Sequence, residues 1–320
     1  MKVFHEIIEY RRRELLLIWG VFTLFIFSEF MFRVAHQGPY NLQIAWECVI
    51  GFITYMIGPW FLTFFLFINA YVIGRMFLGF AVRGIKFRTD LEETLFCSGT
   101  GFGLLSTATY IIGLSGLLYP FIFGIASIFI VASGYRHVAH LFRAIRHGFS
   151  PLKWDVLDGF LLVLLGLFIL NTFLNPNNPA TGYDSINSHL CAPKWYLRGH
   201  AIHFFPWINF NNFPQITEML FTLQMMVFKD PGASVVYLNM LMIVGATWLI
   251  GSRYFGRKAA LAAVVVLLIN EKILYLGRLA MVEQILGFYV IMMLLSVLAW
   301  WESRDRRWLV LLGISSGLSC

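Results

Sequence analysis

Long apolar stretches separated by short polar joints dominate the chain and predict its secondary structure. A segment that crosses the hydrocarbon core of a bilayer needs roughly 20 mostly apolar residues in a helix, because its backbone amides must find partners within the segment. The stretches that meet or approach this length predict nine spans, near residues 15–33, 49–74, 95–114, 116–134, 156–174, 233–251, 259–276, 284–301 and 308 to the end. We therefore expect an all-α fold, a polytopic transmembrane helix bundle whose last span is incomplete.

The charged residues in the joints predict the orientation of the spans. With a cytoplasmic N-terminus, most of the 24 lysines and arginines fall in cytoplasmic joints, as the positive-inside rule requires. The formal net charge of +7 is then a topology signal and calls for no nucleic-acid partner. A composition of 59% hydrophobic and 13% charged residues also indicates an integral membrane protein. We expect a multi-pass protein of the cell membrane.

The lengths of the joints divide the chain into two sections. Residues 1–150 form an N-terminal transmembrane section with short joints, whereas residues 151–320 carry one long outer loop, 175–232. Loops longer than about 15 residues are usually functional or disordered. This loop is rich in Trp, Phe, Met and Leu, as in "PKWYLRGHAIHFFPWINF" and "FPQITEMLFTLQMMVF". We therefore expect it to contain short interfacial helices that lie along the membrane surface.

A run of small residues, "CSGTGFGLLSTATYIIGLSGLL" (97–118), lies in the third predicted span. Small side chains let helix backbones approach closely in lipid, so the run predicts tight packing against another helix. Its Gly101-x-Gly103 pattern lacks a preceding strand and a following lysine, which argues against a nucleotide-binding loop.

The first candidate for chemistry is Asp184, about ten residues after the fifth predicted span. It follows the turn-rich "NPNNPATG" and has Tyr183 and His189 nearby. A carboxylate at the outer membrane face is suited to accept a proton from a sugar hydroxyl within hydrogen-bond reach. The structural alternative is an Asp that caps a helix starting at Ser185, since Asp is a preferred N-cap residue.

The second candidate is Glu283, at the outer start of the eighth predicted span. A carboxylate beside an apolar run is costly unless it has a partner or a function. Arg278 lies five residues earlier and Lys272 is also near, so the structural alternative is an interfacial Glu283–Arg278 ion pair.

Other chemistries have weaker signals. His189, His200 and His203 share the loop with Asp184 and make a zinc site conceivable, but no HExxH or Cys/His zinc spacing is present. There is no GxSxG motif, and the four cysteines show no metal-ligand spacing. A multi-pass transporter or channel is the alternative function, although the polar residues gather in an outer loop and no internal repeat is evident.

Four stretches together resemble a known family: "YDSINSHLCAPKWYLRGHAI", "NFPQITEML", "GSRYFGRKAALAA" and "GRLAMVEQILGFYVIMM". Over about 155–320 the chain resembles the polyprenyl-phosphate-dependent membrane glycosyltransferases of the GT-C fold, in particular bacterial members related to protein O-mannosyltransferases and the aminoarabinose transferase of lipid A. The resemblance implies that Asp184 is the catalytic base and that Glu283 is the second catalytic acid. The sequence departs from the family pattern in carrying Glu at 283 where Asp is usual, and Cys191-Ala192 where proline is expected nearby.

The resemblance also implies the substrates and the place of the reaction. The donor would be a hexose or pentose on a polyprenyl phosphate, and the acceptor a hydroxyl of a glycan, lipid or protein in the bacterial cell envelope. Arg278, Lys272, His189 and Tyr183 would bind substrate, and whether a divalent metal ion takes part stays open. The final apolar run, "WLVLLGISSGLSC", is shorter than a crossing requires, so we expect a longer natural chain whose later spans are needed for activity.

Overall fold

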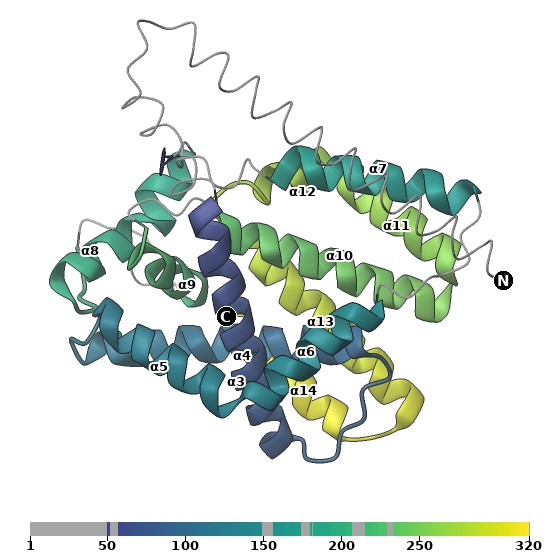
Figure 1. The fold of residues 1–320 in the computed structure, drawn as a ribbon, viewed down its shortest axis with the longest axis horizontal. Coiled ribbons are helices and arrows are strands. Elements are labelled where there is room, and N and C mark those ends of the chain that lie inside the picture. The colour runs from purple at the N-terminus through teal and green to yellow at the C-terminus, as the bar shows by residue number, and fades with distance from the viewer. Residues whose placement is uncertain are drawn as a thin grey trace, which may run out of the picture. The chain divides into compact units, whose positions relative to one another are not determined.

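The structure is a computed structural model that describes residues 50–51, 57–148, 156–173, 180, 182–206, 215–228 and 233–319. The chain divides into two compact units, Met1–Thr54 and Tyr55–Cys320. The predicted first span, 15–33, lies outside the described residues. The described part of the second unit is helical and contains no β-strand, which confirms the all-α prediction (Figure 1).

The helices follow one another along the chain with short connections. In order they are α3 (Gly58–Ala81), α4 (Asp90–Leu114), α5 (Pro120–Ser133), α6 (Tyr135–Gly148), α7 (Val156–Phe173), the π-helical turn η3 (Ser185–His189), α8 (Cys191–Gly199), α9 (Ile216–Met225), α10 (Ser234–Tyr254), α11 (Arg257–Ile269), α12 (Glu271–Leu276), α13 (Glu283–Ser303) and α14 (Arg307–Gly317). Four helices, α3, α4, α10 and α13, are long and apolar enough to cross a membrane. The bent pair α5–α6 gives a fifth crossing if it is counted as one span. The expectation of nine spans is therefore confirmed only in part.

Two predicted spans are interrupted. The span predicted at 116–134 is the 14-residue helix α5, and the chain bends by 74° between α5 and α6. The span predicted at 259–276 breaks at Asn270, whose side chain accepts hydrogen bonds from the backbone N–H groups of Lys272 and Ile273 and so begins α12. A side-chain cap of this kind satisfies amides that would otherwise lack partners at a helix start.

Helices α3 and α4 approach so closely that only glycine fits at two contact points. A Cβ atom on Gly74 would lie 1.8 Å from the carbonyl oxygen of Cys97, and one on Gly101 would lie 1.7 Å from the carbonyl oxygen of Ala70. The run of small residues in α4 therefore has the packing role that the sequence predicts.

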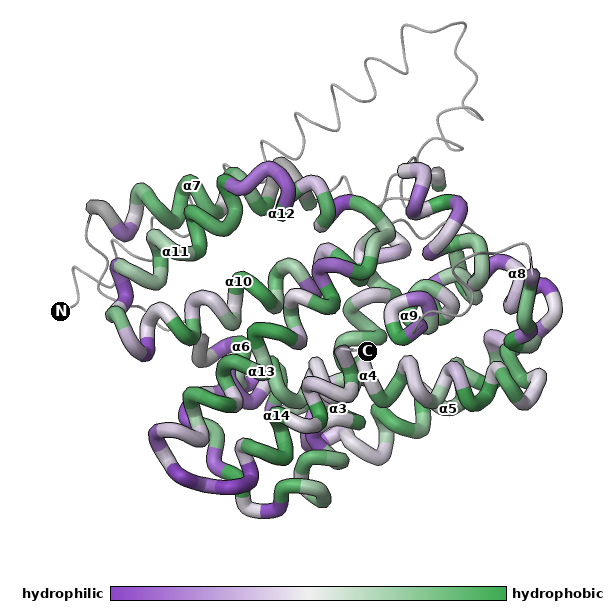
Figure 2. Tube along the Cα trace, turned by 180° about the vertical axis from the view of Figure 1, so that it is seen from behind, coloured by the Kyte–Doolittle hydropathy of each residue, from purple (hydrophilic) through white to green (hydrophobic). Residues whose placement is uncertain are grey.

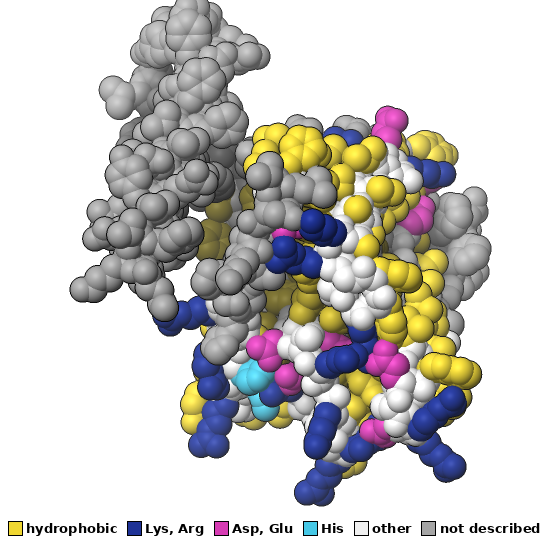
Figure 3. Space-filling model, turned by 90° about the vertical axis from the view of Figure 1, so that its right-hand side faces the viewer, with side chains coloured by type: hydrophobic (Ala, Val, Ile, Leu, Met, Phe, Trp, Pro, Cys, Tyr) yellow, Lys and Arg dark blue, Asp and Glu magenta, His cyan; other side chains and the backbone are white. Residues whose placement is uncertain are grey.

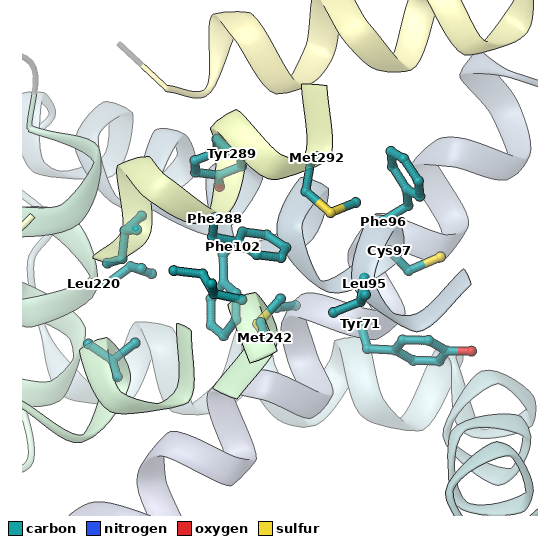
Figure 4. Packing of buried hydrophobic residues seen from close by; sticks show 14 of the residues in the cluster. Tyr71, Leu95, Phe96, Cys97, Phe102, Leu220, Met242, Phe288, Tyr289 and Met292 are labelled. Carbon is teal, nitrogen blue, oxygen red and sulfur yellow. The ribbon is translucent and has the colours of Figure 1, made fainter. Parts of the chain in front are cut away.

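The main hydrophobic core lies where α4 meets α10 and α13 (Figure 4). The ring of Phe288 packs over Gly99, where an added Cβ would lie 2.6 Å from the Phe288 Cε1 atom. The Tyr289 hydroxyl donates a hydrogen bond of 2.9 Å to the Gly99 carbonyl oxygen. These contacts fix the start of α13, and with it Glu283, against the centre of the bundle.

Outward-facing apolar residues mark surfaces suited to lipid. Helix α5 has no buried residue among those described, and Ile125, Ile128 and Phe129 are each more than 60% exposed. Figure 2 shows hydrophobic colouring along α5, α7 and α11. This pattern is the reverse of a soluble surface and supports the membrane assignment.

Ion pairs join the helix ends that the sequence predicts to be cytoplasmic, which we call the inner end (residues 82–90, 253–258 and 302–307). Arg253 of α10 pairs with Glu92 of α4 at 3.0 Å and with Glu302 of α13. Arg257 of α11 pairs with Asp158 of α7. Figure 3 views this end, where Lys and Arg gather together with Asp and Glu. Basic residues far apart in the sequence thus meet in one layer.

The predicted domain boundary near residue 150 stays a prediction, because residues 149–155 lie outside the described part of the chain. Helices on both sides of it share contacts: α4 packs against α9 and α10.

Candidate functional site

The candidate residues lie at the opposite helix ends, which we call the outer end (residues 113–119, 182–206, 215–218 and 270–283). Short helices η3, α8 and α9 occur in the long loop, as predicted, and lie on the left in Figure 1. The loop is tied to the end of α4, since the Ile202 N–H donates to the Gly113 carbonyl oxygen at 2.9 Å. The Leu118 N–H donates likewise to the His200 carbonyl oxygen at 3.0 Å.

Helix α9 is enclosed more deeply than an interfacial helix requires. All its residues from Thr217 to Met225 are buried, and α9 contacts α4, α8 and α3. Its side chains, Glu218 and Gln224 among them, therefore pack within protein, so this part of the outer loop belongs to the folded structure. A loop anchored in this way can hold side chains in fixed positions.

Asp184 directly precedes the π-helical turn η3 and is exposed. Its φ and ψ angles are −65° and −37°, and within the described residues its side chain makes no capping hydrogen bond. The N-cap alternative is therefore not seen here. π-helical turns are rare and occur frequently at functional sites. The geometry leaves the Asp184 carboxylate accessible to a substrate.

His189 ends the same turn and meets a buried acid. Its Nδ1 atom lies 2.7 Å from the Oε1 atom of Glu218 in the first turn of α9. Glu218 is 7% exposed, and its Oε2 atom has no hydrogen-bond partner among the described residues. The sequence reasoning missed Glu218, although a single acid within the apolar "ITEMLFTL" was the signal that could have found it.

Of the other candidate residues in the loop, Tyr183 is exposed and His200 packs against the protein. Tyr183 is 79% exposed beside Asp184. His200 stacks on the ring of Tyr119 at 4.1 Å between centroids, and its Nδ1 atom lies 3.1 Å from the Leu118 carbonyl oxygen. These contacts give His200 a structural role and argue against a zinc site formed by His200 and His203.

Tyr196 of α8 forms part of the support of the loop. Its hydroxyl donates a hydrogen bond of 2.8 Å to Gln215 Oε1, just before α9. Burial raises the pKa of Tyr196 to about 12, against the smaller lowering effect of the bond to Gln215. Tyr196 therefore stays a neutral donor at every physiological pH and joins α8 to α9.

The second acid lies where α12 turns into α13. Glu283 is exposed in the first turn of α13, and none of the ion pairs among the described residues includes it. Arg278 instead donates from Nε to the Leu274 carbonyl oxygen at 3.1 Å, so the predicted Glu283–Arg278 pair is not seen. Lys272 is exposed on α12.

The two candidate segments lie close together at one point. A Cβ atom on Gly182, two residues before Asp184, would lie 3.7 Å from the Cδ2 atom of Leu279. Leu279 follows Arg278 directly and precedes Glu283 by four residues. The fold thus brings together segments that are about a hundred residues apart in the sequence. That both carboxylates line one cavity stays a prediction.

A grouping that could ligate a metal ion occurs among the described residues at Asp90, Glu93 and His140, toward the inner end. Arg75 pairs there with Glu93 at 2.9 Å and lies 2.6 Å from His140 Nδ1. A cation that already faces these ligands opposes metal binding, so the cluster fits an ion-pair network better.

Comparison with known proteins gives one match. Residues 214–320 match the family described as dolichyl-phosphate-mannose-protein mannosyltransferase. The matched segment includes Glu218, Lys272, Arg278 and Glu283, whereas Asp184 and His189 precede it. Neither the curated proteins nor the solved structures contain a match. The match covers about a third of the chain, and together with the membrane-length helices it supports a relation of this segment to the membrane glycosyltransferases of the GT-C type.

Proposed function

We propose that this chain transfers a hexose or pentose from a polyprenyl-phosphate donor to an acceptor hydroxyl on the extracytoplasmic side of a bacterial cell membrane. The observation that carries the proposal is the proximity of Gly182 to Leu279, whose Cδ2 atom would lie 3.7 Å from a Cβ atom added at Gly182. It joins the Asp184 segment to the matched segment that holds Arg278 and Glu283. The family description, with its dolichyl-phosphate-linked mannose, supports a lipid-linked donor.

Asp184 is the proposed general base. Its exposed carboxylate, without a capping bond in the described structure, can take the proton of the acceptor hydroxyl as that oxygen attacks the anomeric carbon. The bond from the anomeric carbon to the phosphate oxygen breaks at the same time. Direct displacement of this kind inverts the anomeric centre, and the polyprenyl phosphate leaves.

The leaving phosphate needs positive charge. Lys272 lies on α12 and Arg278 lies on the turn between α12 and α13, where they can stabilise the negative charge that develops on the phosphate oxygen. Guanidinium groups suit phosphate because their fork of donors binds it in two places. Glu283 would orient these cations or a bound divalent metal ion at the donor.

The test is the choice of donor. The full-length enzyme, reconstituted in membrane vesicles, is given radiolabelled mannose either on a polyprenyl phosphate or as a nucleotide sugar, with envelope glycans, lipids and proteins as acceptors. We expect label in the acceptor only from the lipid-linked sugar, and glucose and aminoarabinose donors are compared in parallel. Transfer from the nucleotide sugar without a lipid carrier would contradict the proposal.

A further inference from the structure

Glu218 has a feature that the proposed reaction does not use: it is a buried acid whose carboxylate contacts His189. Its helix, α9, packs against α4 and α8, and Glu218 as a residue is only 7% exposed. A buried carboxylate is costly unless it is paired or hydrogen-bonded. Among the described residues, the side-chain partner of Glu218 is His189 Nδ1, at 2.7 Å.

The π-helical turn separates that histidine from the proposed base, Asp184, by about one turn. The Leu190 N–H donates to the Ser185 carbonyl oxygen at 2.9 Å, the five-residue spacing of a π-helix. Residues five apart are therefore about one turn apart, so His189 follows Asp184 by about one turn. His189 has a side-chain exposure of 19%, so part of its ring is open.

The contact with Glu218 fixes which ring nitrogen carries the hydrogen. An ionised carboxylate only accepts hydrogen bonds, so the Nδ1 atom of His189 must donate. In a neutral imidazole, the Nε2 atom is then the acceptor and the nitrogen available to a substrate. The buried acid orients the histidine in the way that a carboxylate orients the histidine of a hydrolase.

We propose that Glu218 is a positioning residue that holds His189 in the Nδ1–H tautomer, with Nε2 binding the acceptor hydroxyl next to Asp184. This inference rests on the proposed function. The Glu218 carboxylate contacts His189, and Asp184 precedes His189 by about one turn, so two negative charges disfavour a phosphate on this side. The subsite therefore takes a neutral, hydroxyl-bearing acceptor such as a sugar, while the donor phosphate belongs with Arg278 and Lys272.

The first test reads the tautomer and needs no activity. The chain is labelled with 15N-histidine in lipid nanodiscs at a pH of about 9, above the ordinary histidine pKa, and the His189 ring signals are identified by their loss in His189→Gln. We expect Nδ1–H in the wild type and in Glu218→Gln, whose amide oxygen still accepts. Glu218→Leu should give the Nε2–H form of an unrestrained imidazole. Nε2–H in the wild type would overturn the proposal.

A matched control lies on the same helix. Thr222 donates from Oγ1 to the Glu218 carbonyl oxygen at 2.8 Å and is buried, but its hydroxyl bonds to the backbone and leaves the carboxylate alone. Thr222→Val should therefore keep the Nδ1–H tautomer. Loss of that tautomer in Thr222→Val would mean that general loosening of α9, and not the carboxylate, sets the ring.

The second test asks what His189 binds. Methyl α-mannopyranoside, a neutral hydroxyl probe, should shift the Nε2 signal in the wild type, and farnesyl phosphate should not. A shift with farnesyl phosphate but not with the sugar, or no response to the sugar, would overturn the acceptor role.

Transfer rates give a further measurement. In the full-length enzyme, Glu218→Gln should transfer sugar within about threefold of the wild-type rate, and Glu218→Leu about tenfold more slowly. If the wild type transfers no sugar from any lipid-linked donor, the proposed function fails while the tautomer result stands.

Discussion

Single glycines decide how closely the first two long helices of the bundle pack. Because a Cβ atom at Gly101 would lie 1.7 Å from a backbone oxygen of α3, Gly101→Ala must push α3 and α4 apart. We expect it to lower the free energy of unfolding by about 3 kcal/mol or more.

Gly124 on α5 is the matched control, because no atom lies within 4 Å of an added Cβ there. Gly124→Ala should be neutral or stabilise by up to about 1 kcal/mol, as expected for a helix interior. Thermal unfolding in detergent, followed by size-exclusion chromatography, compares the two variants. Equal stability of both variants would contradict the close approach of α3 and α4.

At the residue scale, the sequence predicted which residues matter better than it predicted their interaction partners. The small residues of α4 predicted close helix packing, and the structure confirms it. The two structural alternatives for the acids, a cap at Asp184 and a pair of Glu283 with Arg278, depend on local rotamers, which no spacing rule determines. The Glu218–His189 pair was not predicted, because the two residues are 29 positions apart in the sequence.

At the scale of elements, one arginine connects three helices. Arg253 of α10 pairs with Glu92 of α4, whose side chain is 1% exposed, and with Glu302 of α13. Arg253→Met would leave Glu92 buried without this partner and should cost about 3–5 kcal/mol of unfolding free energy.

Arg88 provides the comparison, because it pairs with the same Glu302 at 3.3 Å but is 64% exposed. Arg88→Met should cost only about 0–1 kcal/mol, since exposed ion pairs are screened by water. Unfolding in detergent measures both variants. If the two changes cost the same, the buried pair does not hold the helices together.

Hydropathy predicted which elements exist, but not where they break. The segments at 95–114, 233–251 and 284–301 correspond to the long helices α4, α10 and α13. The break at Asn270 and the 74° bend after α5 each occur within a few residues, and the mean hydropathy of a whole segment does not show whether a short polar stretch ends a helix or changes its direction. The sequence also did not predict that α9 is buried within the protein, since an apolar run of this kind fits burial in protein and the membrane interface equally well.

At the scale of the whole molecule, the inner and outer helix ends differ in their charged residues, and this difference predicts the membrane topology. The inner end gathers arginines and the outer end holds the candidate acids, so the two should lie on opposite sides of the membrane. In a cysteine-free background, Tyr183→Cys should react with an impermeant thiol reagent from outside, and Lys86→Cys and Arg146→Cys only after the membrane is opened. All three positions are exposed in the structure. Labelling of Lys86→Cys from outside would contradict this arrangement.

The central claim concerns what the assembled outer end does, and Asp184 tests it most directly. Asp184→Asn keeps the size of the side chain and removes its ability to take a proton. In the full-length enzyme with a lipid-linked sugar, normal expression and unchanged unfolding, the account predicts a loss of transfer of about 100-fold or more. Asp305→Asn at the inner end, where Asp305 pairs with Arg307, should transfer normally. Full transfer activity in Asp184→Asn would contradict the account.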